Sequence, residues 1–231
     1  MFPMRWLPPA VLVLALAGLV LAPAKPVGTQ PVPTRLLPLD EGPSDGSFAY
    51  FRAELAAAAK QRDAAFVEKA LHPTVLSSFG EGEGPRVFME FWRVRDPQSQ
   101  FWPRLLRVLE LGGAFRRADG VATFWAPYVY ARWPDALASV GSERAVILSA
   151  QVKLVARPER DAPVLRLLAF DIVEIERRAS DRPDEPYVRV VTVDRSVGYV
   201  GSDQLWSPVD AHAGFQKVAG RWKIIAFVEG D

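Results

Sequence analysis

The chain of 231 residues contains no cysteine. It can therefore form no disulfide bond, and it has neither a thiolate nucleophile nor a cysteine that could carry a lipid. Enzymes that use a cysteine–histidine pair are excluded on the same ground. The folded part of the chain must be stabilised by its own core and its own hydrogen bonds.

Histidine is almost as scarce, because the chain has only His72 and His212. A catalytic zinc would need both histidines and a carboxylate, and the two follow no metal-ligand spacing. We therefore predict no metal and no cofactor. We expect His72 to cap the end of a helix. Asp210 precedes His212 by two residues and could orient it as a base, but we predict no catalytic triad.

No excess of either charge is present, since 28 Lys and Arg face 27 Asp and Glu. Arg5 is the only charged residue among residues 1–24, so removal of that segment leaves 28 minus 1, or 27, of each sign. A balanced chain lacks the strongly basic surface that binds nucleic acid or anionic lipid. We predict no nucleic-acid partner.

The N-terminus has the pattern of a secretory signal peptide. Arg5 supplies the positive charge, Leu7 to Leu21 form an apolar run, and Ala22 to Ala24 are the small residues of a cleavage site. We predict a signal peptide over residues 1–24 and a periplasmic or secreted protein. The alternative is an uncleaved anchor, in which case this segment alone would contact the membrane.

Two regions of different character follow. Residues 25–46 are rich in proline and glycine, which predicts an extended, solvated linker. Residues 47–140 then show helical spacing of apolar residues, beginning with Phe48 and Leu55 and continuing in a second helix that Asp63 can cap. We predict an α+β domain there.

Further helices are expected over residues 86–92 and 101–111, and strands over 74–79 and 121–130. From Ala145 the apolar period changes to two, which predicts a series of short β-strands. The fold class that we predict is therefore an α+β N-terminal domain that precedes or hosts a small all-β unit.

The last predicted element is a β-hairpin over residues 208–231. Its strands are Phe215 to Val218 and Trp222 to Val228, joined by a turn at Ala219-Gly220. The second strand is apolar on both faces apart from Lys223, so we expect neighbouring strands on both sides of it or good cover.

Residues 145–207 contain a series of short segments with a common pattern: Val152–Pro158, Ala162–Leu165, Phe170–Ile175, Tyr187–Val193 and Gly198–Val200. With these segments the region resembles the bacterial SH3-like (SH3b) domain, a family of binding modules of the cell envelope. The resemblance implies a small β-barrel. The sequence departs from the family at Phe170-Asp171, where a Lys-Gly turn is usual, and at Arg195, where a turn glycine is common.

A second pattern is formed by Arg62–Ala65, His72–Val75, Val87–Phe88 and, near the C-terminus, Gly220–Ile224. With these segments, residues 47–130 are similar to the opening of the cone-shaped α+β fold shared by nuclear transport factor two and the SnoaL-like cyclases. If both resemblances hold, the barrel is inserted between Tyr130 and Asp210, and residues 210–231 complete the sheet of the first domain.

Aromatic residues are the candidate ligand contacts, because flat apolar rings bury area at a low entropic cost. In an SH3-like barrel, Tyr187, Tyr199 and Trp206 would border the ligand groove. Tyr128 and Tyr130, expected on one strand face, could hold a sugar ring or a peptide, or could instead fill the interface between the domains.

Carboxylates offer a weaker alternative. Glu81 and Glu83 in the loop GEGEG could bind a cation or act as acid and base, but the spacing of a calcium loop is absent, so we interpret them as a solvated loop. No catalytic residue is predicted.

We predict a non-catalytic binding protein of the cell envelope, which recognises a peptide, a glycan or a protein through its SH3-like domain. Peptidoglycan and envelope proteins are the candidate partners. The alternative is a small-molecule binder, or an isomerase-like or cyclase-like enzyme, with an apolar pocket in the α+β domain. A deep cavity with a buried Asp or Glu would favour the alternative.

Overall fold

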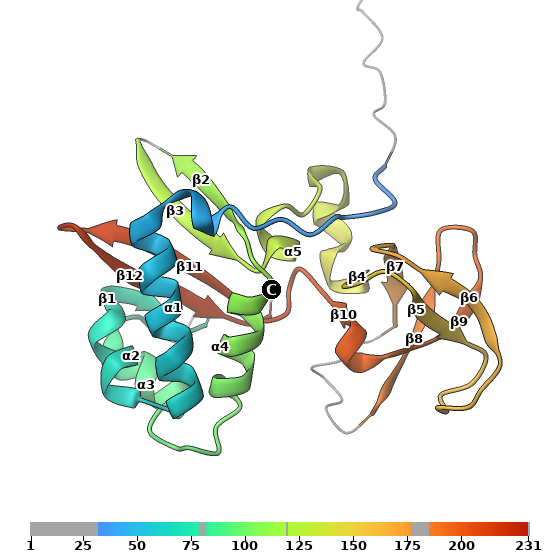
Figure 1. The fold of residues 1–231 in the computed structure, drawn as a ribbon, viewed down its shortest axis with the longest axis horizontal. Helices are drawn as coiled ribbons and strands as arrows, with labels where there is room; N and C mark the ends of the chain where they lie inside the picture. The colour runs from blue at the N-terminus through green and yellow to red at the C-terminus, as the bar shows by residue number, and fades with distance from the viewer. Residues whose placement is uncertain (1–31, 79–81, 119, 177–184, 231) are drawn as a thin grey trace, which may run out of the picture. The chain divides into compact units, whose positions relative to one another are not determined.

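The structure is a computed structural model, and it describes residues 32–78, 82–118, 120–176 and 185–230. The described chain is a mixed α+β protein with two β-sheets (Figure 1), so the coarse fold class is confirmed. The predicted signal peptide lies outside the described residues. Within the described ranges, no helix combines the length and the apolar character that a membrane span requires.

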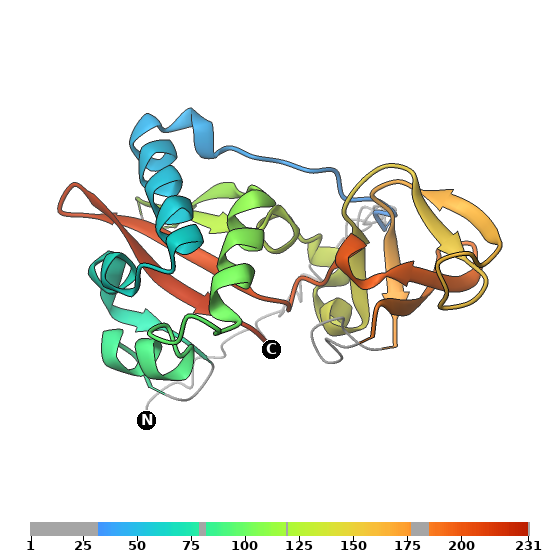
Figure 2. The same ribbon diagram turned by 60° about the horizontal axis from the view of Figure 1, so that its bottom comes forward.

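The first sheet has five strands in the order β1-β12-β11-β3-β2. β1 runs parallel to β12, and the other neighbouring pairs are antiparallel. Helices α1 and α4 lie over one face of this sheet (Figures 1 and 2). The elements are α1 (Gly46–Gln61), α2 (Ala64–Ala70), β1 (Leu71–Leu76), α3 (Pro85–Phe91), α4 (Phe101–Glu110), β2 (Ala114–Ala118), β3 (Val121–Ala126), β11 (His212–Val218) and β12 (Arg221–Val228).

Side-chain caps fix where the first two helices begin. The Asp45 carboxylate accepts hydrogen bonds from the backbone N–H groups of Ser47 and Phe48 at the start of α1. The Asp63 carboxylate accepts one from the N–H of Phe66 at the start of α2. Each cap satisfies donors that the helix itself leaves unpaired. The predicted cap at Asp63 is confirmed.

Aromatic side chains fill the space between the helices and the first sheet. Phe48 of α1 is fully buried, and its ring centroid lies 4.2 Å from that of Phe124 on β3 and 4.9 Å from that of Trp222 on β12. Further along the sheet, the ring of Phe101 on α4 lies 5.2 Å from that of Phe227. Each buried ring contributes about 1.5–3 kcal/mol of hydrophobic stabilisation. The helix-covered face of this sheet is a packed core.

The second sheet has seven antiparallel strands in the order β10-β4-β7-β8-β9-β5-β6. It has its own core, which includes Leu154, Val190 and Val200. Among the described strands no pairing joins β10 to β6, so a closed barrel is not observed. The strands are β4 (Arg144–Ile147), β5 (Val152–Val155), β6 (Val164–Leu168), β7 (Ile172–Ile175), β8 (Tyr187–Val191), β9 (Val197–Gly201) and β10 (Leu205–Trp206).

The second sheet lies, in chain order, between two neighbouring strands of the first. β3 ends at Ala126, which is paired with Ala213 on β11. β12 is flanked by β11 and β1, as its apolar faces predicted, and it pairs with no strand of the second sheet among the described residues. The chain therefore leaves the first sheet after β3 and returns at β11.

A third apolar cluster joins the two sheets. It contains Tyr128 from the short helix α5 (Tyr128–Ala131), Leu137 from the 3-10 helix η2 (Asp135–Glu143), and Val146 and Ile172 from the second sheet. Trp206 packs against this cluster and against the core of the first sheet.

The described part of the proline-rich segment is not a solvated linker. Leu36 donates its N–H to Phe170 O, and Ile172 donates to Thr34 O. Leu36 and Leu39 pack against the third apolar cluster. The prediction for residues 25–46 is therefore wrong from Thr34 onward, because leucines interrupt the prolines and supply apolar surface to bury.

Two departures from the SH3-like pattern occupy left-handed backbone positions. Phe170 has φ +58° and Arg195 has φ +65°. This is the region that glycine adopts without a steric penalty and other residues adopt at a cost. At Arg195 the backbone thus has the conformation of the turn glycine that is common in the family. In the other turn the left-handed residue is Phe170, which stands at the family's lysine, and not Asp171.

Arg195 gives a direct test of that cost. We expect Arg195→Gly to have a free energy of unfolding about 1 kcal/mol higher than Arg195→Ala, because glycine relieves the left-handed strain. The comparison with alanine removes the ion pair of Arg195 with Glu174 from both variants. Urea unfolding of the two variants measures the difference, and equal midpoints would show that this turn stores no strain.

Candidate functional site

Tyr187 and Tyr199 lie on neighbouring strands of the second sheet. Val188 and Val200 are buried, so the alternation of the strands places both half-buried tyrosines on the outer face. Arg189 is directly opposite Tyr199 and forms an ion pair with Glu176. Within the described residues neither phenolic hydroxyl has a hydrogen-bond partner. We call Tyr187, Arg189 and Tyr199 the tyrosine face.

Trp206 and Tyr128 lie elsewhere, at the third apolar cluster. Tyr128 is 1% exposed and Trp206 is half-buried. The Tyr128 hydroxyl and the Trp206 indole N–H are buried without a hydrogen-bond partner in the described chain. Burial raises the pKa of Tyr128 to about 12. Both side chains contribute to packing between the sheets, and Tyr128 presents no surface to a ligand.

Tyr130 stacks on a buried histidine. Its ring lies 3.8 Å from that of His212 at an interplanar angle of 12°. The Arg116 guanidinium lies over Tyr130 at 5.4 Å. The expected shared strand face of Tyr128 and Tyr130 is wrong, because β3 ends at Ala126 and residues 128–131 form a single helical turn.

His212 is 3% exposed at the start of β11. Its Nδ1 lies 3.0 Å from the backbone carbonyl oxygen of Asp210, so Nδ1 carries the proton that it donates. The Asp210 carboxylate accepts the N–H of Ser207 at 2.7 Å. Burial, with a smaller contribution from Arg116, lowers the pKa of His212, while the Asp210 carbonyl opposes the shift. This is a structural, neutral histidine.

The other residues that were considered for catalysis or metal binding form no site in the described part of the chain. His72 lies on β1 beside Thr74 and caps no helix, since α2 ends at Ala70. Glu83 is exposed, and Glu81 lies outside the described residues. Among the described residues, no group of three His, Cys, Asp or Glu side chains could hold a metal ion.

One serine motif was overlooked in the sequence. Gly42 to Gly46 has the Gly-x-Ser-x-Gly spacing of a nucleophile turn, with Ser44 at its centre. Ser44 is exposed in the 3-10 helix η1 (Gly42–Ser44), and its hydroxyl donates to the Glu41 carbonyl. A nucleophile turn follows a strand and pairs its serine with a histidine base, but no described strand leads into this turn and the Ser44 hydroxyl is not paired with a histidine. Ser44 therefore does not change the prediction that the chain has no catalytic triad.

The helix-covered face of the first sheet offers no acid for catalysis. The only carboxylate that is buried among the described residues is Asp210, which precedes β11. A general base in an apolar pocket needs a buried Asp or Glu and space for a substrate. The rings packed around Phe48 and Phe101 include no buried carboxylate among the described residues.

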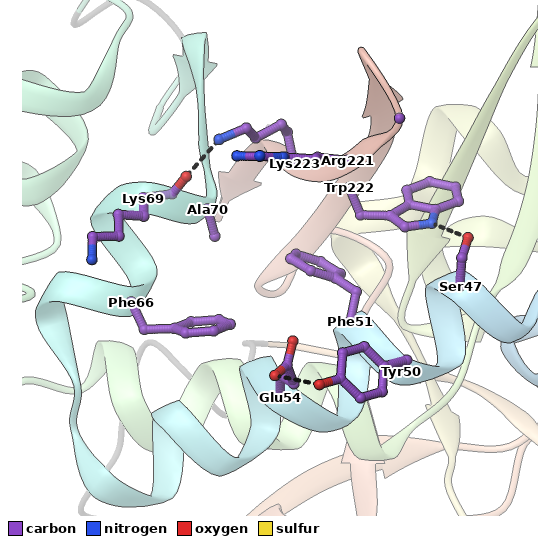
Figure 3. Close-up of a pocket in the computed structure, with 11 residues that line it drawn as sticks. Ser47, Tyr50, Phe51, Glu54, Phe66, Lys69, Ala70, Arg221, Trp222 and Lys223 are labelled. Atoms are coloured by element: carbon purple, nitrogen blue, oxygen red, sulfur yellow. Dashed lines mark hydrogen bonds between the residues drawn. The ribbon is translucent and has the colours of Figure 1, made fainter.

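A cleft lies at one edge of this core, between α1, α2 and the start of β12 (Figure 3). Its volume is about 620 Å³. The rings of Phe51 and Phe66 point into it from α1 and α2, and Arg221 and Lys223 extend across it from β12 toward α2. None of these residues was predicted to belong to a site. The available signal in the sequence was that Arg221 and Lys223 stand on either side of Trp222 in the predicted hairpin.

Comparisons of the chain with protein-family models, with curated proteins and with solved structures gave no match.

His212 predicts a pH-dependent stability. Its folded pKa is lowered from 6.5, so the unfolded chain binds the proton first as the pH falls. The free energy of unfolding should then decrease below about pH 6.5, with a slope that approaches about 1.4 kcal/mol per pH unit. Urea unfolding between pH 7.5 and 5, roughly the range in which histidine titrates, measures it.

His212→Gln should flatten this decrease, since glutamine can donate to the Asp210 carbonyl and does not titrate. His72→Gln is the matched control and should keep the wild-type response, because His72 lies partly exposed on β1. The assignment to His212 would be wrong if both variants lost stability on acidification as steeply as the wild type.

Proposed function

We propose that this chain is a non-catalytic binding protein, in which the second sheet is an SH3-like module carried by a cone-shaped α+β host. The proposal rests on a difference between the two sheets in where their aromatic side chains lie. The interior of the first sheet is filled by aromatic side chains, whereas the second sheet presents two tyrosines and an arginine on its outer face.

The order of strands supports the SH3-like part of this proposal. The strand pairs β4–β10, β5–β9 and β8–β9 bring the ends of residues 145–207 together around one small core. The left-handed residue Arg195 has the backbone that the family forms with glycine at this turn. The topology of the first sheet, with β12 between β1 and β11, supports the cone-shaped host.

The tyrosine face supports recognition of an envelope peptide, glycan or protein. Phenol rings that are half-buried keep a fixed orientation and expose a flat apolar surface, which suits a sugar ring or a peptide. Arg189 supplies a guanidinium beside Tyr199 for a carboxylate or a carbonyl of the partner. The signal-peptide pattern predicted for residues 1–24 supports a partner in the envelope, and we propose peptidoglycan first.

Loss of one ring should weaken binding. We expect wild-type protein to co-sediment with purified peptidoglycan and Tyr199→Ala to bind at least about tenfold more weakly, equivalent to about 1.4 kcal/mol. Tyr199→Phe should retain most of the affinity if ring stacking is the main contribution.

The matched control is Phe91→Ala, which removes an exposed aromatic ring from helix α3, outside the second sheet. This variant should bind as the wild type does. Peptidoglycan as partner would be refuted by a wild-type protein that stays in the supernatant. The tyrosine face would be refuted by equal binding of Tyr199→Ala and wild type.

A further inference from the structure

The cleft of Figure 3 has an apolar floor. Phe51 and Phe66 are partly buried against the core of the first sheet, and Ala70 and Trp222 lie beside them. A volume of about 620 Å³ falls within the range of small-molecule sites, about 300–1,000 Å³. The cleft is therefore of a size for a small organic ligand.

Polar groups around this floor are already satisfied. The indole N–H of Trp222 donates to Ser47 Oγ at 3.0 Å, and Lys217 Nζ donates to the same oxygen at 2.9 Å. The Tyr50 hydroxyl donates to the Glu54 carboxylate at 2.9 Å. A ligand body that rests on the rings therefore needs to make no hydrogen bond there, which favours an apolar one.

Positive charge gathers on the opposite side of the cleft. Arg221 and Lys223 line it, as does Lys69, whose ammonium points away from Phe51 and Phe66 (Figure 3), and Glu54 is the one acidic lining residue. Lys223 Nζ donates to the carbonyl oxygen of Lys69 at the end of α2, at 2.5 Å. Among the described residues, neither Lys69 nor Arg221 forms an ion pair. The cations thus have charge that no described carboxylate neutralises.

We propose that this cleft binds a small carboxylate with an apolar body of about seven to ten carbon atoms. The carboxylate is held by Arg221 and Lys223, since a guanidinium binds a carboxylate with two parallel hydrogen bonds. The apolar body lies on Phe51 and Phe66. Glu54, on the α1 side, repels the carboxylate and so sets the direction in which the ligand enters.

This site is separate from the tyrosine face, and it goes beyond the proposed function. The cations belong to β12 and α2, and the rings to α1 and α2, so no residue of the second sheet takes part. The ligand is defined by its chemistry, an anionic head on an alkyl or aryl body, and the two bodies are distinguished by the choice of probe.

The test is isothermal titration of the full chain with octanoate, 2-naphthoate, octanol and octyltrimethylammonium. We expect octanoate or 2-naphthoate to bind, octanol to bind at least about tenfold more weakly, and the cationic probe not to bind. The stronger of the two carboxylates identifies an alkyl or an aryl body. Absence of binding by both carboxylates, or equal binding of octanol and octanoate, would overturn the proposal.

Variants assign the binding to this cleft. Arg221→Gln with Lys223→Gln should weaken carboxylate binding at least about tenfold and leave octanol unchanged. The matched control, Lys153→Gln with Arg157→Gln, removes two exposed charges from the second sheet and should change neither. Wild-type affinity in the Arg221 and Lys223 double variant would overturn the assignment.

Phe66→Ala should weaken octanoate and octanol together, and its melting temperature shows whether a loss reflects unfolding instead. Tyr199→Ala should bind the carboxylate as the wild type does. A failure of the tyrosine face in the peptidoglycan assay and a failure of this cleft in the titration are therefore independent results.

Discussion

The pairing of β3 with β11 is the constraint on which the rest of the structure depends. It brings Ala126 and Ala213 side by side, although a complete second sheet lies between them in the chain. That sheet must begin and end near the same place, and it does so with its own core around Val190. An apolar cluster that includes Tyr128 and Ile172 is buried where the chain passes from one sheet to the other. Hydrophobic burial at the junction thus orders residues that would otherwise be linkers.

The same packing decides where function can reside. Phe48 packs against Phe124 and Trp222 between α1 and the first sheet, so a ligand could occupy this part of the helix-covered face only by displacing core side chains. The cleft beside Arg221 lies at the edge of that core. A ligand would therefore bind at the surface, where the two proposed sites present different side chains. Tyr187 and Tyr199 offer neutral rings beside one guanidinium, whereas the cleft beside Arg221 offers rings beneath uncompensated cations.

Patterns that are local in sequence predicted much of this fold. The Asp63 cap, the terminal hairpin and the period-two strands follow from spacing and capping alone. What was missed depends on contacts distant in sequence. β2 has two arginines and β6 is an edge strand with exposed Leu165 and Leu167, so neither has a regular alternation of apolar and polar residues in the sequence. The helix α5 has four residues, too few for a helical period. The cleft combines residues of three elements, and no spacing in the chain could unite them.

Amide chemical shifts can show whether the second sheet is the part of the chain that binds peptidoglycan. The full chain would be titrated with soluble peptidoglycan fragments, and the shifted amides mapped on the two sheets. We expect saturable shifts that concentrate on β8 and β9 around Tyr187, Arg189 and Tyr199. Shifts confined to the first sheet, in the core around Phe48 and Phe124, would contradict this expectation, because they would mean that the ligand enters the interior that the structure fills.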